Sequence, residues 1–124
     1  MSCACGIRPV VTLRIVFSVI LAVMLYVTVN ASMAYSIADV SARIGHDWWF
    51  RATLTDAYCG FITFFCWVAY LEKTCLRRAL WLVAILLLGN IAMAVYVLIR
   101  LFRLPADAPA SAILLRREDL PDAL

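Results

Sequence analysis

The chain has 124 residues, of which 66% are hydrophobic and 15% are charged, and its formal net charge is +3. Soluble domains average about 45–50% apolar and about 25% charged residues, and a soluble domain this short could not bury so much apolar surface. The composition therefore excludes a soluble globular protein, and the same apolar excess excludes a disordered chain. We expect a small integral membrane protein.

The first apolar segment follows Arg14, and no charged residue occurs between Arg14 and Asp39. This stretch is longer than the roughly 20 residues that cross a 30 Å hydrocarbon core, so we predict a membrane-spanning helix over about residues 12–35. Residues 32–34 (Ser-Met-Ala) are compatible with cleavage of a signal peptide. The apolar run exceeds the 7–15 residues typical of a signal core, which favours a retained helix.

The connection that follows is expected to lie at the membrane surface. Its apolar residues have helical spacing, which predicts a short interfacial helix: Ile37, Val40 and Ile44. Aromatic side chains come next, and rings of this kind are typical of headgroup depth: Trp48, Trp49 and Phe50.

Two more apolar segments follow. The second covers about residues 52–71 and contains one ionisable side chain, Asp56, and the third covers about residues 79–101. Segments in lipid must be helical, because their backbone polar groups have to be satisfied internally. We therefore predict an all-α bundle of three transmembrane helices within residues 1–104. The tail at 105–124 is polar and contains several prolines, which predicts extended or disordered chain.

Orientation depends on which side of the membrane carries more Lys and Arg. Three spans would place five cations on the side of the N-terminus: Arg8, Arg14, Lys73, Arg77 and Arg78. They would place six on the other side: Arg43, Arg51, Arg100, Arg103, Arg116 and Arg117. The first helix usually sets the orientation. We therefore expect the N-terminus inside the cell, in a bacterial inner membrane.

Polar side chains within the predicted helices are the candidate functional residues. An ionised Asp in the bilayer costs about 2.5–3.5 kcal/mol on insertion scales and needs a partner. At 1.5 Å per residue, Asp56 lies about 8 Å from the midplane, and straight helices would give Asn30 and Tyr96 a similar depth. We predict that Asn30, Asp56 and Tyr96 form a cluster.

Small residues in the second and third helices are predicted to mark helix packing, because they let two backbones approach closely: Gly60, Thr63, Gly89 and Asn90. Asp56 has three possible roles. It could form an interhelical hydrogen bond, it could be a protonatable carboxyl that couples proton movement to a substrate or an ion, or it could be hydrated at the interface with Thr53 as the helix N-cap.

Motifs for catalysis and cofactor binding are missing from the sequence. The five cysteines form no Cys-x-x-Cys pair, and one histidine, His46, cannot supply both axial ligands of a haem. There is no Gly-rich phosphate loop and no nucleophile elbow. We therefore expect no enzyme activity, no cofactor, no metal site and no nucleic-acid partner. The expected partners are the lipid bilayer and either a second copy of this chain or a larger membrane protein.

A pattern of aromatic, polar and small residues runs through the second and third segments: A-T-x-x-D-x-Y, then W-V-x-Y-x-E, then G-N. It is carried by Trp49, Ala52, Thr53, Asp56, Tyr58, Trp67, Val68, Tyr70, Glu72, Gly89 and Asn90. Over about residues 47–103 the chain resembles an uncharacterised domain-of-unknown-function family of small multi-pass membrane proteins from bacteria and plants. The resemblance implies that Asp56 and Glu72 belong to a family pattern, and it implies no activity.

Two functions remain for such a chain. The first is a structural, accessory or interaction protein that packs with itself or with a larger membrane partner. The alternative is a small oligomeric carrier or channel in which Asp56 is the protonatable coupling residue, since three helices are too few to enclose a pathway alone.

Overall fold

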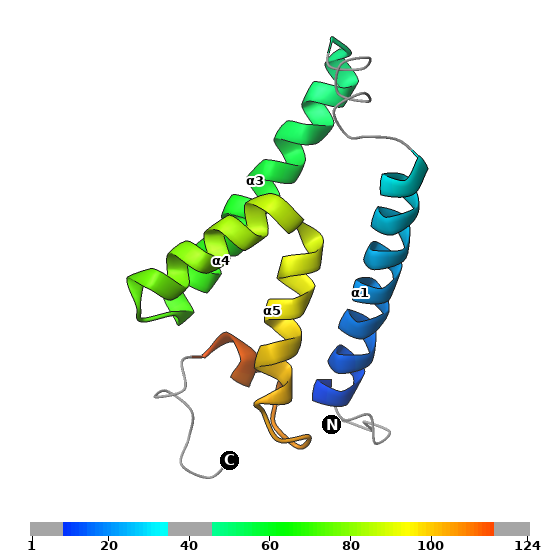
Figure 1. Cartoon of the computed structure of the whole chain (residues 1–124). Helices are drawn as coiled ribbons and strands as arrows, with labels where there is room; N and C mark the ends of the chain where they lie inside the picture. The colour runs from blue at the N-terminus through cyan, green and yellow to red at the C-terminus, as the bar shows by residue number, and fades with distance from the viewer. Residues whose placement is uncertain (1–8, 35–45, 116–124) are drawn as a thin grey trace, which may run out of the picture.

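A computed structural model describes residues 9–34 and 46–115. Within these residues the chain is all-α, with four α-helices, one short 3-10 helix and no strand (Figure 1). The elements are α1 (Pro9–Ala34), α3 (Trp48–Leu71), α4 (Cys75–Leu88), α5 (Asn90–Phe102) and η1 (Ala110–Leu114). The interfacial helix expected around residues 37–44 lies outside the described residues.

Among the described helices, α1 and α3 are the two that are long and apolar enough to cross a membrane. They contain 26 and 24 residues, which corresponds to about 39 and about 36 Å. The α3 helix begins at Trp48, earlier than the predicted residue 52. The reason is an N-cap: the Asp47 carboxylate accepts a hydrogen bond of 2.8 Å from the backbone N–H of Trp49.

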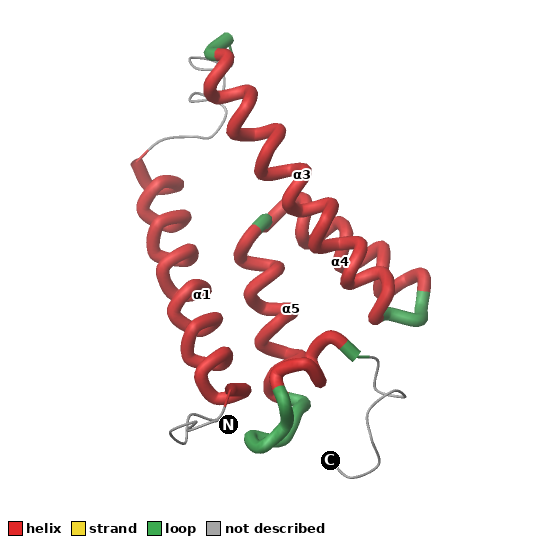
Figure 2. The backbone as a smooth tube through the Cα atoms, turned by 180° about the vertical axis from the view of Figure 1, so that it is seen from behind, coloured by secondary structure: helices red, strands yellow, loops and turns green. Residues whose placement is uncertain are grey.

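The prediction of one continuous helix over residues 79–101 is wrong, because the chain breaks at Gly89 into α4 and α5. Gly89 has φ +55° and ψ −127°, a conformation that residues with a Cβ rarely adopt. The Gly89 N–H donates to the Ile85 carbonyl at 2.8 Å and ends α4, and its own carbonyl accepts from Met93 and begins α5. As a result α5 runs back beside α1 (Figures 1 and 2).

The helices pack in pairs, with α1 on α5, α3 on α4 and α4 on α5. One apolar cluster joins the start of α1 to the end of α5 and to η1: Val10, Val97, Leu101, Ala108, Ala112 and Ile113. A second cluster joins α3, α4 and α5: Val68, Leu71, Ile85, Ala92 and Tyr96. Because both clusters include residues of α5, this helix is the centre of the described core.

The start of the tail is ordered, contrary to the sequence prediction for residues 105–124. The apolar residues Ala112 and Ile113 of η1 are buried against the first cluster. The Arg100 guanidinium also donates to the carbonyls of Ile113 (3.3 Å) and Leu115 (2.7 Å). The polar composition of the tail as a whole concealed this short apolar stretch, and residues 116–124 lie outside the described residues.

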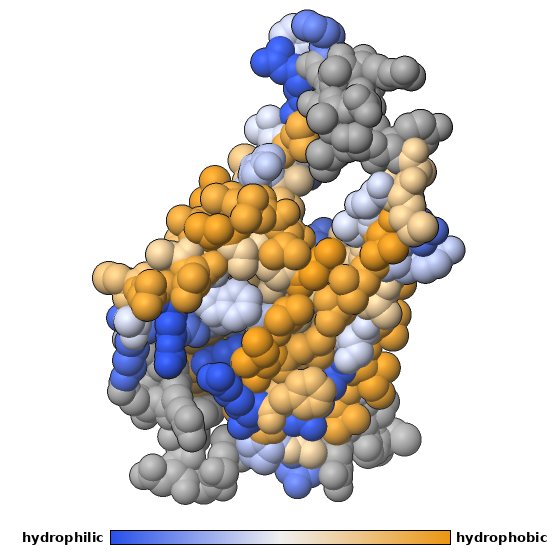
Figure 3. Space-filling view, viewed as in Figure 1, coloured by the Kyte–Doolittle hydropathy of each residue, from blue (hydrophilic) through white to orange (hydrophobic). Residues whose placement is uncertain are grey.

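The face of the molecule drawn in Figure 3 is mostly apolar across its middle. Large hydrophobic side chains are exposed along α1 and α4, among them Val16, Tyr26, Leu80 and Leu87. The hydrophilic side chains gather toward the two ends instead (Figure 3).

Candidate functional site

The structure does not bring Asn30, Asp56 and Tyr96 together. The Asn30 amide is exposed and donates to the Tyr26 carbonyl of its own helix at 2.7 Å. Asp56 is exposed on α3. The Tyr96 hydroxyl contacts Glu72, which follows Asp56 by sixteen residues, or about 24 Å along α3.

The break at Gly89 explains why this predicted cluster does not form. A straight third helix would carry Tyr96 toward the start of α3, at the depth of Asp56. Because α5 instead turns back at Gly89, Tyr96 lies at the other end of α3, beside Glu72.

Gly89, one of the predicted packing residues, lies against α3 in the structure. A Cβ built on Gly89 would lie only 2.8 Å from Cζ of Phe61, so the α4–α5 turn can sit this close to α3 only with glycine. The neighbouring Asn90 is exposed. The second and third predicted segments therefore do meet here, but the contact is made by Phe61 and not by Gly60 or Thr63.

A stripe of small and polar residues on α3 is left exposed, and we call it the α3 face. Its members are spaced by three or four residues and so share one side of the helix: Ala52, Asp56, Cys59, Gly60 and Thr63. Nothing lies within 4 Å of the position that a Gly60 Cβ would take. The Thr63 hydroxyl donates to the Cys59 carbonyl at 2.9 Å, within its own helix. In the described part of the chain, no element covers this face.

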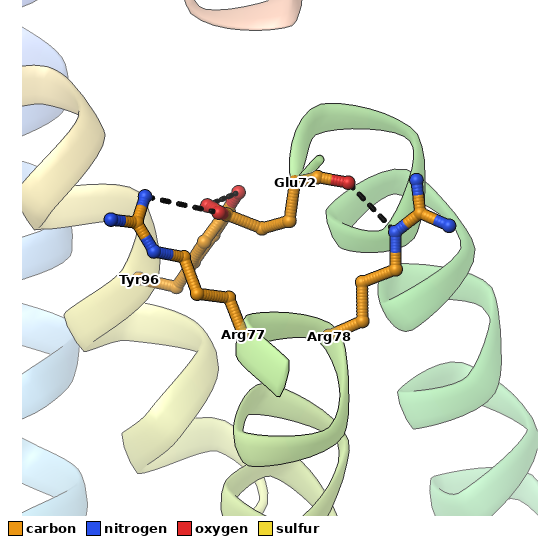
Figure 4. A network of polar contacts seen from close by, with 4 residues as sticks. All are labelled: Glu72, Arg77, Arg78 and Tyr96. Atoms are coloured by element: carbon orange, nitrogen blue, oxygen red, sulfur yellow. Dashed lines mark hydrogen bonds and ion pairs between the residues drawn. The ribbon is translucent and has the colours of Figure 1, made fainter. Parts of the chain in front are cut away.

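Glu72, at the end of α3, is the centre of a polar network (Figure 4). Its Oε1 accepts a hydrogen bond from the Tyr96 hydroxyl at 3.2 Å, and its Oε2 lies 3.9 Å from Nη1 of Arg77. Its backbone carbonyl accepts from Nε of Arg78 at 2.7 Å. With only 15% of its side chain exposed, Glu72 ties α3 to both α4 and α5.

Aromatic rings fix the position of Tyr96, which is 2% exposed. Phe64, Trp67 and Trp81 surround its ring edge-on, with centroids 4.8 to 6.1 Å away. Edge-to-face contacts of this kind are favourable for aromatic pairs. The cage therefore holds the Tyr96 hydroxyl toward Glu72.

Arginine side chains close the helix ends on this side of the molecule. Arg14 of α1 donates to the Leu101 carbonyl at 2.8 and 3.2 Å and to the Leu104 carbonyl at 2.7 Å. Its guanidinium also lies 5.1 Å from the centre of the Phe102 ring. The last carbonyls of a helix have no partner within the helix, so Arg14 caps α5 from a neighbouring element.

The cations gathered here are called the basic end. Three lie around the α3–α4 turn, two at the end of α5 and one in α1: Lys73, Arg77, Arg78, Arg100, Arg103 and Arg14. The sequence analysis counted these residues but did not predict that they lie at one end of the molecule. The signal that could have done so is the Gly-Asn pair at 89–90, which interrupts an otherwise uninterrupted apolar run.

Among residues 9–34 and 46–115, no group of three or more His, Cys, Asp and Glu side chains could hold a metal ion. Cys59, Cys66 and Cys75 are free, exposed thiols. The arrangement thus offers one carboxylate–hydroxyl–guanidinium network and one exposed carboxylate on an apolar helix.

A comparison with protein families confirms the resemblance noted in the sequence. A family model described as "Protein of unknown function (DUF1475)" matches residues 6–120. The match is wider than the predicted 47–103 and includes α1 and η1, which sequence reasoning had left outside the pattern. No curated protein and no solved structure matches the chain.

Proposed function

The chain belongs to the DUF1475 family of unknown function, and we propose that it is a small multi-pass membrane protein that assembles with another membrane helix through the α3 face. The observation that carries this proposal is the exposure of Asp56 and Gly60 on α3, whose only other charged residue is Arg51 near its start.

Length and surface composition support the membrane location. Both α1 and α3 exceed the roughly 30 Å of a hydrocarbon core, and large apolar side chains cover their outer surfaces. At the start of α3 the Arg51 guanidinium lies 5.1 Å from the centre of the Trp48 ring. This pair of side chains is typical of the membrane interface.

The chemistry of the α3 face supports a protein partner. A carboxylate such as Asp56 that faces lipid is unfavourable by about 2.5–3.5 kcal/mol, whereas a facing helix can supply a hydrogen-bond donor. Gly60 has open space beside it, which lets a second backbone approach closely. We take a second copy of this chain as the first candidate and a larger membrane protein as the other.

Cys59 allows a direct test, because it lies on the α3 face and is exposed. In a full-length variant that keeps only this cysteine, oxidation in native membranes should produce a disulfide-linked dimer. Gly60→Leu should reduce the dimer at least several-fold, because the larger side chain keeps the helices apart.

The matched control places the only cysteine at Leu54, which is exposed on the opposite side of α3. It should give no dimer under the same conditions. Attachment of a photoreactive maleimide to Cys59 separates the two candidate partners, since an adduct with another protein would support the larger-partner version. Equal dimer from the Cys59 and Leu54→Cys variants, or no adduct at all from Cys59, would contradict assembly through this face.

A second candidate function is proton-coupled transport by the assembled oligomer, favoured because Asp56 shares the face of Gly60. In that case Asp56→Asn abolishes proton flux into vesicles that contain the purified chain, while crosslinking at Cys59 persists. Unchanged flux in the Asp56→Asn variant would leave only the interaction role.

A further inference from the structure

We propose that α4 and α5 form a re-entrant hairpin, which enters and leaves the membrane on the same side, and that the resulting basic end binds anionic phospholipid headgroups of the cytoplasmic leaflet. The inference rests on the membrane location proposed above and deepens it by naming a lipid partner.

The lengths of α4 and α5 point to a hairpin. They contain 14 and 13 residues, or about 21 and about 20 Å, so neither alone crosses a hydrocarbon core of roughly 30 Å. A continuous helix over both would be long enough, but the break at Gly89 turns the chain back (Figures 1 and 2).

The depth of the α4–α5 turn also supports a re-entrant hairpin. Gly89 packs directly on Phe61, and Phe61 lies near the middle of α3, which runs from Trp48 to Leu71. If α3 crosses the membrane, the tip of the α4–α5 hairpin therefore reaches only about half its depth.

Both ends of the hairpin lie on one side of the molecule. The α4 helix begins beside Glu72, the residue that ends α3, and the Tyr96 hydroxyl of α5 returns to the same carboxylate. The end of α5 is held by Arg14, near the start of α1. Since α1 and α3 are consecutive spans, the start of α1 and the end of α3 already share one side.

This arrangement separates the charges, which three spans would have left evenly divided. Six of the seven described Lys and Arg residues belong to the basic end, and Arg51 is at the other. With Glu72 and Asp107 included, the basic end has a net charge of +4. The other described charged residues sum to −1: Arg51, Asp47 and Asp56. Cytoplasmic loops carry the excess of Lys and Arg, so the basic end faces the cytoplasm.

The lipid partner follows from the chemistry of these side chains. Arg14, Arg78 and Arg100 donate to backbone carbonyls, which fixes them at the helix ends. Arg77, with 68% of its side chain exposed beside Glu72, and the exposed Arg103 remain accessible to solvent or lipid. Guanidinium groups bind phosphate oxygens in a bidentate manner, and the cytoplasmic leaflet is anionic.

The first test asks on which side of the membrane each end lies, in full-length variants that each carry a single cysteine. Single cysteines are placed at 75 (the native Cys75), at 111 (Ser111→Cys) and at 46 (His46→Cys), and a membrane-impermeant maleimide is applied to intact cells and to inverted vesicles. We expect positions 75 and 111 to react only in inverted vesicles, and position 46 only in intact cells.

Reaction of positions 75 and 111 from opposite sides would mean that α4 and α5 cross the membrane, and would overturn the hairpin. Failure of the membrane location itself would look different. All three positions would react alike, and alkaline carbonate would extract the chain.

The second test measures the lipid preference of the purified full-length chain by native mass spectrometry, with phosphatidylglycerol and phosphatidylcholine added in equal amounts. We expect several-fold more phosphatidylglycerol to stay bound, and we expect the Arg77→Gln, Arg103→Gln double variant to lose most of that preference. Arg51→Gln, at the other end, is the matched control and should keep it. Equal retention of the two lipids, or an equal loss in the Arg51→Gln control, would overturn the lipid assignment.

Discussion

At the scale of single residues, Tyr96 illustrates how one hydroxyl can specify the packing of a helix. Its ring lies in an apolar cluster with Val68 and Ile85, where a hydroxyl without an acceptor would cost about 1–3 kcal/mol. Glu72 supplies that acceptor from the end of α3. A rotation or shift of α5 would break the bond, so the pair favours one position of α5 against α3.

We expect Tyr96→Phe to destabilise the protein by about 1–2 kcal/mol, because the ring keeps its contacts while Glu72 loses a donor. The midpoint of thermal unfolding in detergent, followed by tryptophan fluorescence, measures the effect. Tyr26→Phe is the control, since Tyr26 is exposed on α1. Equal midpoints for the two variants would show that the hydrogen bond contributes nothing.

At the scale of elements, the break at Gly89 determines the fold of the second half of the chain. It divides one apolar run into two short helices, and it places the carbonyls of residues 86–88 and the N–H groups of residues 90–92 outside the helical ladder. The hairpin exists because glycine tolerates the required backbone conformation and leaves room for Phe61.

Gly89→Ala should therefore be among the most damaging small substitutions in the chain. A positive φ at a residue with a Cβ costs about 1–3 kcal/mol, and the contact with Phe61 adds overpacking. Gly60→Ala is the matched control, because its Cβ would meet nothing within 4 Å. Thermal unfolding of the detergent-solubilised chain distinguishes them, and a Gly89→Ala midpoint as high as that of Gly60→Ala would contradict the geometry.

The same residue explains what the sequence could and could not predict. Uncharged apolar runs of about 20 residues predicted α1 and α3 within a few residues, because a long run of this composition favours a single helix. Hydrophobicity carries no information about backbone torsions, so the break at Gly89 and the position of Tyr96 were missed together. The role of Glu72 was missed for a related reason, since its partner arrives only after the chain has turned back.

At the scale of the whole molecule, the two ends of the described chain are packed together. Val10, in the first turn of α1, shares an apolar cluster with Leu101 of α5 and Ile113 of η1. Arg14 and Arg100 add hydrogen bonds to carbonyls at the same place. The fold is therefore closed by contacts between its first and last elements.

Ile113→Ala should destabilise the closed fold by about 2–3 kcal/mol, because it removes buried methyl and methylene groups from this cluster. Leu114→Ala, at an exposed neighbouring position, should cost less than about 1 kcal/mol. Unfolding midpoints measure both, and proteolysis after residue 104 provides a second readout, since η1 should be released more readily in the Ile113→Ala variant. Similar values for the two variants would argue against a structural role for η1.

The hydrogen bond between Arg14 and the Leu101 carbonyl joins residues 87 positions apart in the chain. During synthesis, α1 therefore leaves the ribosome well before α5 does. At about 5–20 residues per second, a ribosome needs on the order of 10 s to deliver α5 after α1 has emerged. During that interval α1 lacks α5, the helix that packs along it. Contacts between residues so distant in sequence also form slowly, because the intervening loop must close first. We therefore expect α5 to dock onto α1 late in folding, and until then the side of α1 that packs on α5 is uncovered.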